Sequence, residues 1–372
     1  MRWNWLRIGL VACALATTRA RAGYTVVDLG VLPGGSVSAG AAINASGLVT
    51  GVSDSSGGLR AFLGNGGTPQ NVGVLPGGTY SIGTALNTTG VVVGDANTAT
   101  GSVHAFVAIG PGQVSDLGVN SGWLQSHATG INDNGLVSGY ALLAGNVQHA
   151  FVSDGSGHLT DLGTFPGGTN SRANGINSSG VVVGSADNAS GVFHAFITGP
   201  GGTLVDLGGL GSPSVATFGT AINNLGVVVG YGGAAGSYHA FRSNSSGGLD
   251  DLGVLQGFTS SQANAINNLG LIVGTASSGS GSSTAFLYTA TDGQVDLNTL
   301  LSPGSGWTLS TATGINDAGQ ITGTGLFENQ THAYRLDPAA VPEPSGLLLG
   351  GLGLFCLLAA WGRGAGALAV KP

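Results

Sequence analysis

Charged residues are scarce in this chain of 372 residues. Only 7% of its positions are Asp, Glu, Lys or Arg, whereas ordinary soluble domains carry roughly 25%. Low charge accompanies disorder only where the apolar content is also low, and here 42% of the residues are hydrophobic. The composition therefore favours a packed body over a disordered chain.

Basic residues are nearly absent from the central part of the chain. Between Gly23 and Val341 four arginines face 16 acidic residues, which leaves a net charge of −12. These arginines are Arg60, Arg172, Arg242 and Arg335. A body of this charge repels phosphate backbones and anionic lipid, so the composition excludes nucleic acid as a partner.

Cysteine is missing from the same region, because Cys13 and Cys356 both lie in the terminal segments. The body therefore has neither a disulfide nor a cysteine metal site, and packing alone has to stabilise it. No Ser-His-Asp set and no pair of carboxylates stands apart from the repeated text described next. We therefore predict no catalytic residue, no metal site and no cofactor.

Glycine, with 71 residues, is abundant, and three landmarks recur seven times each. A DLG-type tripeptide starts, at intervals of 43 and then 45 residues, at Asp28, Asn71, Asp116, Asp161, Asp206, Asp251 and Asp296. An apolar residue precedes Asn44, Asn87, Asn132, Asn177, Asn223, Asn267 and Asn316. A His-Ala-Phe triplet or a variant of it starts at Arg60, His104, His149, His194, His239, Thr284 and His332. Seven matching registers indicate a repeat protein.

One repeat contains four short strand segments. In the best-kept copy these are residues 172–176, 181–184, 192–198 and 203–208, separated by turns rich in Asn, Gly and Pro. Four antiparallel strands in about 45 residues are the size of a propeller blade. The fold class that we predict is all-β, a seven-bladed β-propeller over residues 23–338.

The strand count indicates how the ring closes. The last repeat ends with "HAYRL" (332–336) and has no fourth strand, whereas an unpartnered segment, "YTVVDLG" (24–30), precedes the first repeat. We expect this N-terminal strand to complete the last blade, because closure removes an exposed sheet edge. An eight-bladed ring or an open solenoid is the alternative.

The repeated polar residues have a structural interpretation. The triplet histidines are spread around a circle, too far apart to share one metal ion, so we interpret them as hydrogen-bonding residues; they are His104, His149, His194, His239 and His332. The repeated aspartates, such as Asp28 and Asp116, precede a turn whose backbone N–H groups a carboxylate can accept.

Aromatic residues that depart from the repeat are more informative for function. Trp123, His127, Phe258 and Trp307 fall where other repeats carry Gly, Ser or Thr, in the predicted linker between fourth and first strands. Trp123 and Trp307 are candidate ligand contacts, because exposed aromatic rings there can stack on sugars. The alternative is that they cover the core.

Both termini carry targeting features. Residues 1–22 combine Arg2 and Arg7, an apolar run at 8–16 and a cleavage site at Ala20 and Ala22, which predicts a signal peptide handled by the general secretion machinery and signal peptidase. A lipidated Cys13 is the alternative. A Pro-rich linker (339–345) precedes a predicted transmembrane helix within 346–372, apolar from 346 to 361.

Two resemblances follow from these motifs. "VPEPS" (341–345), which contains Pro342, Glu343 and Pro344, precedes an apolar run and Arg363 and resembles a PEP-CTERM sorting signal. Its implied partner is an exosortase, a membrane enzyme that processes proteins for the surface of Gram-negative bacteria. The repeats over residues 24–336 resemble the HAF family of extracellular repeats, which implies a location and a repeat type but no reaction.

The sequence thus predicts an exported, non-enzymatic protein of the cell surface or extracellular matrix, anchored transiently or permanently in the inner membrane by its C-terminal helix. One alternative is a glycan-binding propeller whose partner is an extracellular polysaccharide. The other is a glycan-cleaving enzyme with its site at the ring axis. The enzyme predicts polar residues unique to single blades that cluster at one mouth of the channel.

Overall fold

The computed structural model describes residues 23–154, 157–234 and 236–339. The predicted signal peptide, its cleavage site at Ala20 and Ala22, the Pro-Glu-Pro motif and the predicted transmembrane helix lie outside these residues. Among the described residues, no helix is both long enough and apolar enough to cross a membrane.

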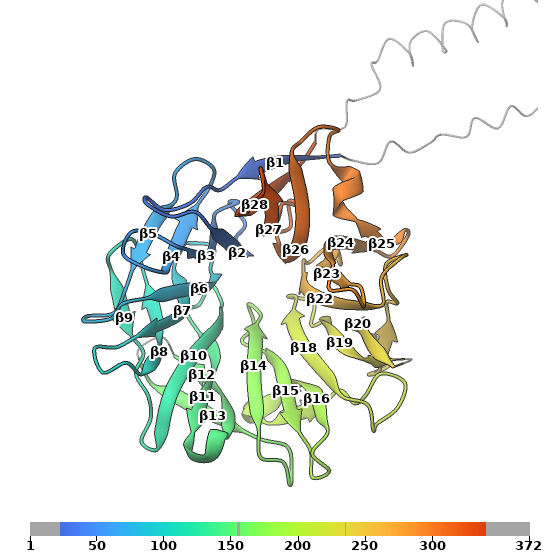
Figure 1. Ribbon diagram of the computed structural model, residues 1–372. Coiled ribbons are helices and arrows are strands. Elements are labelled where there is room, and N and C mark those ends of the chain that lie inside the picture. Colours follow the sequence, from blue (N-terminus) through green and yellow to red (C-terminus); the bar gives the residue numbers. More distant parts are fainter. Residues whose placement is uncertain (1–22, 155–156, 235, 340–372) are drawn as a thin grey trace, which may run out of the picture. The chain divides into compact units, whose positions relative to one another are not determined.

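The described chain is a ring of seven antiparallel sheets, each with four strands (Figure 1). This confirms the predicted all-β, seven-bladed propeller. The only helices in the described ranges are short 3-10 turns, η1 (Ala144–Asn146), η2 (Pro200–Gly202) and η3 (Leu297–Leu300). Asn and Gly turns connect the strands, and the short apolar segments between them have the β-branched character of strands.

Blades are numbered along the chain, and each is given from its inner to its outer strand. Blade 1 consists of β2 (Ser38–Ile43), β3 (Val49–Ser53), β4 (Arg60–Gly64) and β5 (Gln70–Gly73). Blade 2 consists of β6 (Ser81–Leu86), β7 (Val92–Asn97), β8 (Val103–Ala108) and β9 (Val114–Asp116). Blade 3 consists of β10 (Trp123–Ile131), β11 (Val137–Leu143), β12 (Gln148–Ser153) and β13 (Leu159–Gly163). Blades 4 and 5 consist of β14 (Ser171–Ile176), β15 (Val182–Asp187), β16 (Phe193–Thr198) and β17 (Leu204–Asp206); β18 (Thr217–Ile222), β19 (Val228–Ala234), β20 (Ser237–Ser243) and β21 (Leu249–Asp251). Blades 6 and 7 consist of β22 (Ser260–Ile266), β23 (Ile272–Ser277), β24 (Ser283–Thr289) and β25 (Gly293–Asp296); β26 (Trp307–Ile315), β27 (Ile321–Phe327), β28 (Gln330–Pro338) and β1 (Tyr24–Asp28).

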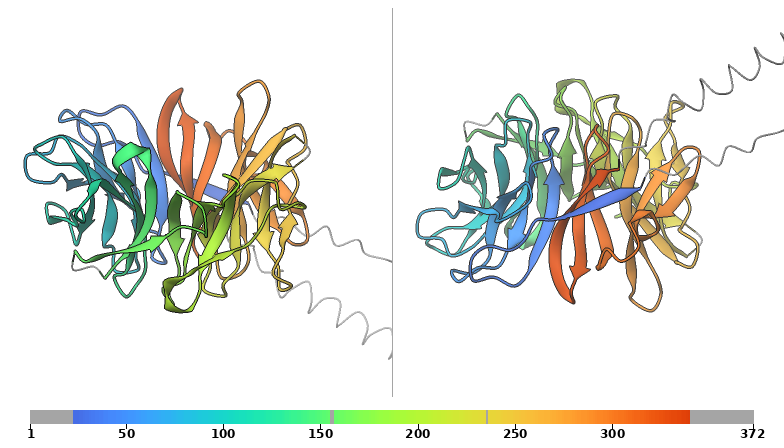
Figure 2. Two further views of the ribbon diagram at one scale, coloured as in Figure 1. Left: turned by 90° about the horizontal axis from the view of Figure 1, so that it is seen from below. Right: turned by 90° about the horizontal axis from the view of Figure 1, so that it is seen from above.

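The N-terminal strand closes the ring, as the strand count predicts. β1 pairs antiparallel with β28, in a register that joins Tyr24 to Pro338 and Val27 to Arg335. In Figure 2 the blue strand lies beside the red strands of blade 7. Blade 7 therefore contains both ends of the described chain, and its outer edge strand comes from the start of the sequence.

Phenylalanines and glycines build the core between blades. The ring of Phe196, in the triplet of blade 4, is fully buried, and Gly184 lies beneath it on β15. A Cβ atom at Gly184 would come within 2.0 Å of the Arg172 carbonyl oxygen and 2.8 Å of the Phe196 ring. Glycine is therefore required at this position, because only a bare backbone fits between strand and ring.

The repeated asparagines link neighbouring blades around the channel. The Asn177 side-chain carbonyl accepts the backbone N–H groups of Ser179 and Val181, while its amide donates to the Asn223 carbonyl of the next blade. Six blade junctions carry such an amide bond, donated by Asn44, Asn132, Asn177, Asn223, Asn267 and Asn316. The bond from Asn316 to Asn44 spans the closing junction at 2.9 Å. One side chain thus stabilises both a turn and a blade interface.

Candidate functional site

The inner strands all run in the same direction, so the two ends of the channel are built differently. One end, the asparagine mouth, consists of the turns that begin at the seven repeated asparagines, and residues of blades 1 to 5 line a pocket of about 260 Å³ there. The interior beyond these turns is lined by Ala, Gly and Ile residues together with several Thr and Asn side chains. Because the asparagine mouth repeats nearly the same text, it offers little that is specific to one blade.

The opposite end, the variable mouth, differs from blade to blade. Each inner strand carries there the residue that follows a recurring Ser or Thr. Around the ring these residues are Ala39, Ile82, His127, Arg172, Phe218, Gln262 and Thr311. Their cross-strand partners are Val52, Asp95, Tyr140, Ser185, Tyr231, Thr275 and Thr324. Chemistry that differs between blades is therefore concentrated at this end.

A stack of polar and aromatic groups crosses blades 2 to 4 at the variable mouth. The Asp95 carboxylate lies 2.8 Å from Nδ1 of His127, whose ring stacks on Tyr140 with centroids 4.5 Å apart and planes 9° apart. The guanidinium carbon of Arg172 lies 4.2 Å from the centroid of the same Tyr140 ring. Four side chains from three blades thus form one contiguous cluster.

Burial raises the pKa of the Tyr140 hydroxyl above its ordinary value of 10, while the positive charge of Arg172 lowers it and the Asp95 carboxylate raises it further. Tyr140 is consequently protonated at neutral pH, where its hydroxyl is a hydrogen-bonding group and its ring is a stacking surface. Neither role requires ionisation, and both suit ligand contact better than nucleophilic attack.

Next to this stack lies a pocket of about 440 Å³, lined mainly by blades 4 and 5. Its lining consists of Gln148, Arg172, Asn174, Ser185, Phe193, Phe218, Thr220, Tyr231 and Gln262. The Phe218 ring stacks against both Phe193 and Tyr231, with centroids 5.9 Å and 5.1 Å apart. Aromatic faces, amides, hydroxyls and one cation line this pocket, and no carboxylate does.

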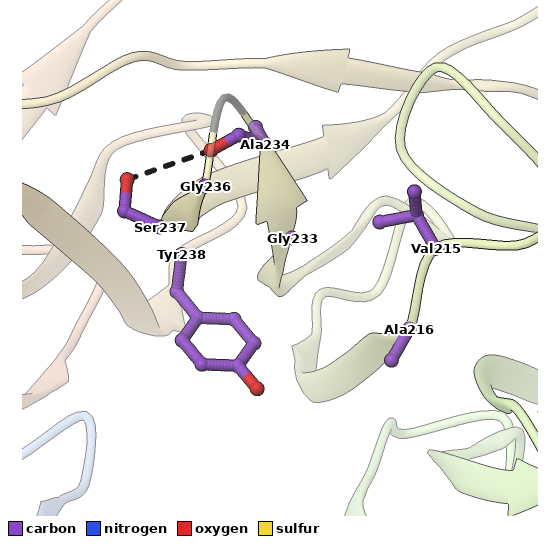
Figure 3. Close-up of a pocket in the computed structure, with 7 residues that line it drawn as sticks. All are labelled: Val215, Ala216, Gly233, Ala234, Gly236, Ser237 and Tyr238. Atoms are coloured by element: carbon purple, nitrogen blue, oxygen red, sulfur yellow. Dashed lines mark hydrogen bonds between the residues drawn. The ribbon is translucent and has the colours of Figure 1, made fainter.

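The aromatic series continues into a second hollow on blade 5. Tyr231 meets Tyr238 edge to face, with centroids 5.5 Å apart, and Tyr238 borders a pocket of about 420 Å³ opposite Val215 and Ala216 (Figure 3). None of the residues that line this second pocket is charged. It can extend an apolar contact surface, but it offers little to orient a polar ligand.

The repeated histidines and aspartates lie away from both pockets. In each of five blades Nδ1 of the triplet histidine lies within hydrogen-bond distance of an aspartate on the neighbouring outer strand; the pairs are His104–Asp116, His149–Asp161, His194–Asp206, His239–Asp251 and His332–Asp28. Asp28 and Asp116 also accept the backbone N–H two residues further on. Within the described ranges, no group of three or more His, Cys, Asp or Glu could hold a metal ion.

The departing aromatics need a correction. Trp123 and Trp307 do not lie in linkers, since they open β10 and β26, the two nine-residue inner strands. There Trp123 contacts Phe151, with centroids 5.8 Å apart, and Trp307 stacks on Phe327 at 5.1 Å. Both rings pack onto core clusters. His127 likewise belongs to β10, whereas Phe258 does lie in a linker, where its N–H closes a turn.

The pocket residues Arg172, Phe218, Tyr231 and Gln262 were not singled out by sequence reasoning. The sequence nevertheless contains a pattern that could have found three of them, because Arg172, Phe218 and Gln262 each directly follow the recurring Ser or Thr of their repeat. That Ser or Thr is a structural residue: the Ser171 hydroxyl accepts the N–H of Ala150 on the preceding blade. The residue after this Ser or Thr makes no such repeated structural hydrogen bond, so its type can differ between blades.

The chain carries a sorting signal. A PEP-CTERM protein-sorting motif matches residues 340–363, which include Pro342, Glu343 and Pro344. A motif of this type implies an exported protein that is processed by an exosortase for the cell surface. A second family model, described as a protein of unknown function (DUF3466), matches residues 251–339.

No curated protein matches the chain, whereas several solved structures share its type of backbone. TolB from Acinetobacter baumannii is 12% identical with a TM-score of 0.42, and the match covers 67% of this chain and 63% of TolB. A Trypanosoma rangeli sialidase is 12% identical with a TM-score of 0.40, and the match covers 82% of this chain and 60% of the sialidase. The six-bladed Aleuria aurantia lectin is 14% identical with a TM-score of 0.35, over 70% of this chain and 95% of the lectin. This likeness carries no statement about activity.

Proposed function

We propose that this chain is an exported, exosortase-sorted surface protein that binds extracellular polysaccharide without cleaving it. The observation that carries the proposal is the pocket at the variable mouth, where Phe218 and Tyr231 present stacked aromatic rings beside the side-chain amides of Gln148 and Gln262. Sugar rings bind in this way, because their C–H faces pack on aromatics while their hydroxyls bond to amides.

The lining of the pocket supports binding over cleavage. Hydrolysis of a glycosidic bond usually requires two carboxylates on either side of that bond, and none of the residues that line the pocket is Asp or Glu. The cluster of Asp95, His127, Tyr140 and Arg172 does meet the condition that a glycan-cleaving enzyme sets, namely polar residues unique to single blades at one mouth. That cluster, however, contains a single carboxylate, Asp95, whose Oδ2 lies 2.8 Å from Nδ1 of His127, whereas the usual mechanism needs two carboxylates.

Two further parts of the proposal concern the whole chain. The repeats are of the HAF extracellular type, a view supported by the triplets at His104, His149, His194 and His239. The signal peptide at residues 1–22 and an anchor within 346–372 would deliver and hold the ring outside the inner membrane. Both segments lie outside the described residues, and anchoring through the second stays a prediction.

Affinity electrophoresis through gels that contain soluble neutral or acidic polysaccharides tests this function. We expect the wild-type chain to be retarded by at least one polymer. Phe218→Ala should weaken that binding roughly two- to twelvefold, because a stacked aromatic contact is worth about 0.5–1.5 kcal/mol. Leu225→Ala is the matched control, since Leu225 is 74% exposed and follows the turn asparagine at the other mouth.

Circular dichroism of each variant separates a lost contact from a lost fold. If the wild-type chain binds none of the polymers, the proposal is wrong. It is also wrong if Phe218→Ala, folded like the wild type, binds as tightly as Leu225→Ala. Release of reducing sugar from a bound polymer would instead favour the enzyme.

A further inference from the structure

Within the part of the chain that the structure describes, Arg172 is the arginine without an acidic or carbonyl partner. Among the described residues the other arginines are occupied: Arg60 donates to the carbonyls of Gly57 and Thr79, Arg242 pairs with Asp250, and Arg335 pairs with Asp337. Arg172 instead lies over the face of Tyr140. In a body with a net charge of −12, an exposed arginine that no carboxylate neutralises is available to an anion from outside.

The surroundings of Arg172 hold the guanidinium in place without using its donors. The guanidinium carbon lies 4.2 Å from the centroid of the Tyr140 ring, and a cation–π contact of this kind leaves the guanidinium N–H groups able to donate to a ligand. The nearby Asp95 carboxylate is paired with His127, and no acidic residue lines the pocket. Arg172 can therefore donate hydrogen bonds to a ligand carboxylate without breaking an internal ion pair.

The rest of the pocket selects the kind of anion. The rings of Phe218 and Tyr231, stacked on each other, form an apolar wall of the pocket, and Gln148 and Gln262 add neutral donors and acceptors. A free inorganic anion would use Arg172 and the amide donors but not the aromatic rings. A sugar ring that bears a carboxylate uses all of them, because the planar carboxylate matches the arginine fork and the ring fits the aromatics.

We infer that this pocket binds a uronic-acid-type sugar, with the carboxylate on Arg172 and the sugar ring against Phe218 and Tyr231. The inference rests on the proposed function, since it names the class of polysaccharide that the same pocket would take. Long-range repulsion from the acidic exterior opposes every polyanion, so the local contact with Arg172 has to offset it for a polyuronate to bind.

The test compares two polymers that differ only in charge: polygalacturonate and the same polymer after its carboxylates have been reduced to alcohols. The full-length chain should bind polygalacturonate more tightly than the reduced polymer. Arg172→Gln should lower affinity for polygalacturonate about ten- to hundredfold, as expected for loss of a charged hydrogen-bonded pair, and leave the reduced polymer unaffected. Arg172→Lys keeps the charge but loses the planar fork, so its affinity should fall between the two.

Arg242→Gln is the matched control, because Arg242 is a surface arginine already paired with Asp250 at 3.4 Å, and it should leave both affinities unchanged. Equal binding of both polymers by the wild type, or an Arg172→Gln variant that keeps its preference, overturns the inference. If Phe218→Ala still weakens both polymers in that case, the glycan-binding function stands without it. If the wild type binds neither these polymers nor any neutral one, function and inference fall together.

Discussion

Removal of a single ring asparagine measures how much the blade junctions contribute to stability. Asn177 is 5% exposed, and Asn177→Ala removes three hydrogen bonds, two within its turn and one to the Asn223 carbonyl. Each net bond is worth about 1 kcal/mol, and water cannot readily replace partners that stay buried. We expect the free energy of unfolding to fall by about 3 kcal/mol.

The same blade offers a matched control. Asn188 caps an outer turn in the same way, since its side chain accepts the N–H groups of Ser190 and Val192, but among the described residues it bonds to no other blade. Water reaches this turn, so Asn188→Ala should cost about 1 kcal/mol. The two variants therefore differ mainly in the burial of the side chain and the bond to the next blade.

Thermal unfolding of the two purified variants provides the assay. With an unfolding entropy of roughly 2.1 cal/mol/K per residue, 1 kcal/mol shifts the Tm of a ring this size by about 1.5 °C. Asn177→Ala should then melt about 4–5 °C below the wild type, and Asn188→Ala about 1–2 °C below it. Equal losses in the two variants would refute the reasoning, because the junction bond would then contribute nothing measurable.

Three further variants test the packing and the pH response. Leu29 is fully buried between blades 7 and 1, so Leu29→Ala should lower the free energy of unfolding in urea by about 2–5 kcal/mol. Val205 is 43% exposed, so Val205→Ala should lower it by less than about 0.5 kcal/mol. Similar losses in the two variants would contradict the claim that Leu29 belongs to a core that joins blades 7 and 1. Gly184→Ala should cost at least about 1–3 kcal/mol because its Cβ meets the Arg172 carbonyl, while Gly279→Ala meets nothing within 4 Å; a Gly184→Ala chain with wild-type stability would show that the strands can move apart. Burial raises the pKa of Asp187, but hydrogen bonds from Asn170 and Thr169 outweigh it and hold that pKa below its ordinary value. Its contribution to stability is therefore complete above about pH 4 and is lost as the pH falls through the depressed pKa, so Asp187→Asn should flatten the acid limb of a stability–pH curve, and an unchanged limb would contradict this.

Repetition is the reason why the architecture was predictable. The blade 4 segment expected at 172–176 forms a strand from Ser171 to Ile176, and the unpartnered front segment pairs with β28. Seven copies of one pattern average out local ambiguity, and the count alone assigns the last strand. Where a copy departs from the pattern, this advantage disappears. Trp123 pairs with Leu143 across an extended hairpin, and the repeat pattern of the other blades could not have predicted this contact.

The candidate site was harder to predict for the same reason. Reading for recurrence directs attention to residues such as His194 and Asp206, which pair with each other within blade 4. The pocket residues are those in which the copies differ, and their proximity depends on blade packing. Arg172 and Tyr140 are 32 positions apart on adjacent blades, so the contact between them follows from the ring and not from any local pattern.

Because β1 pairs with β28, the hydrogen bonds that close the ring do not depend on whether the C-terminal segment is cleaved. The outermost rung of that ladder joins Tyr24 to Pro338, and the matched sorting motif starts two positions later, at residue 340. Proteolytic trimming anywhere beyond Pro338 thus leaves every rung in place. A force applied to the C-terminal segment would act on β28, which is hydrogen-bonded to β1 on one side and to β27 on the other. Both sets of inter-strand hydrogen bonds would then resist that force.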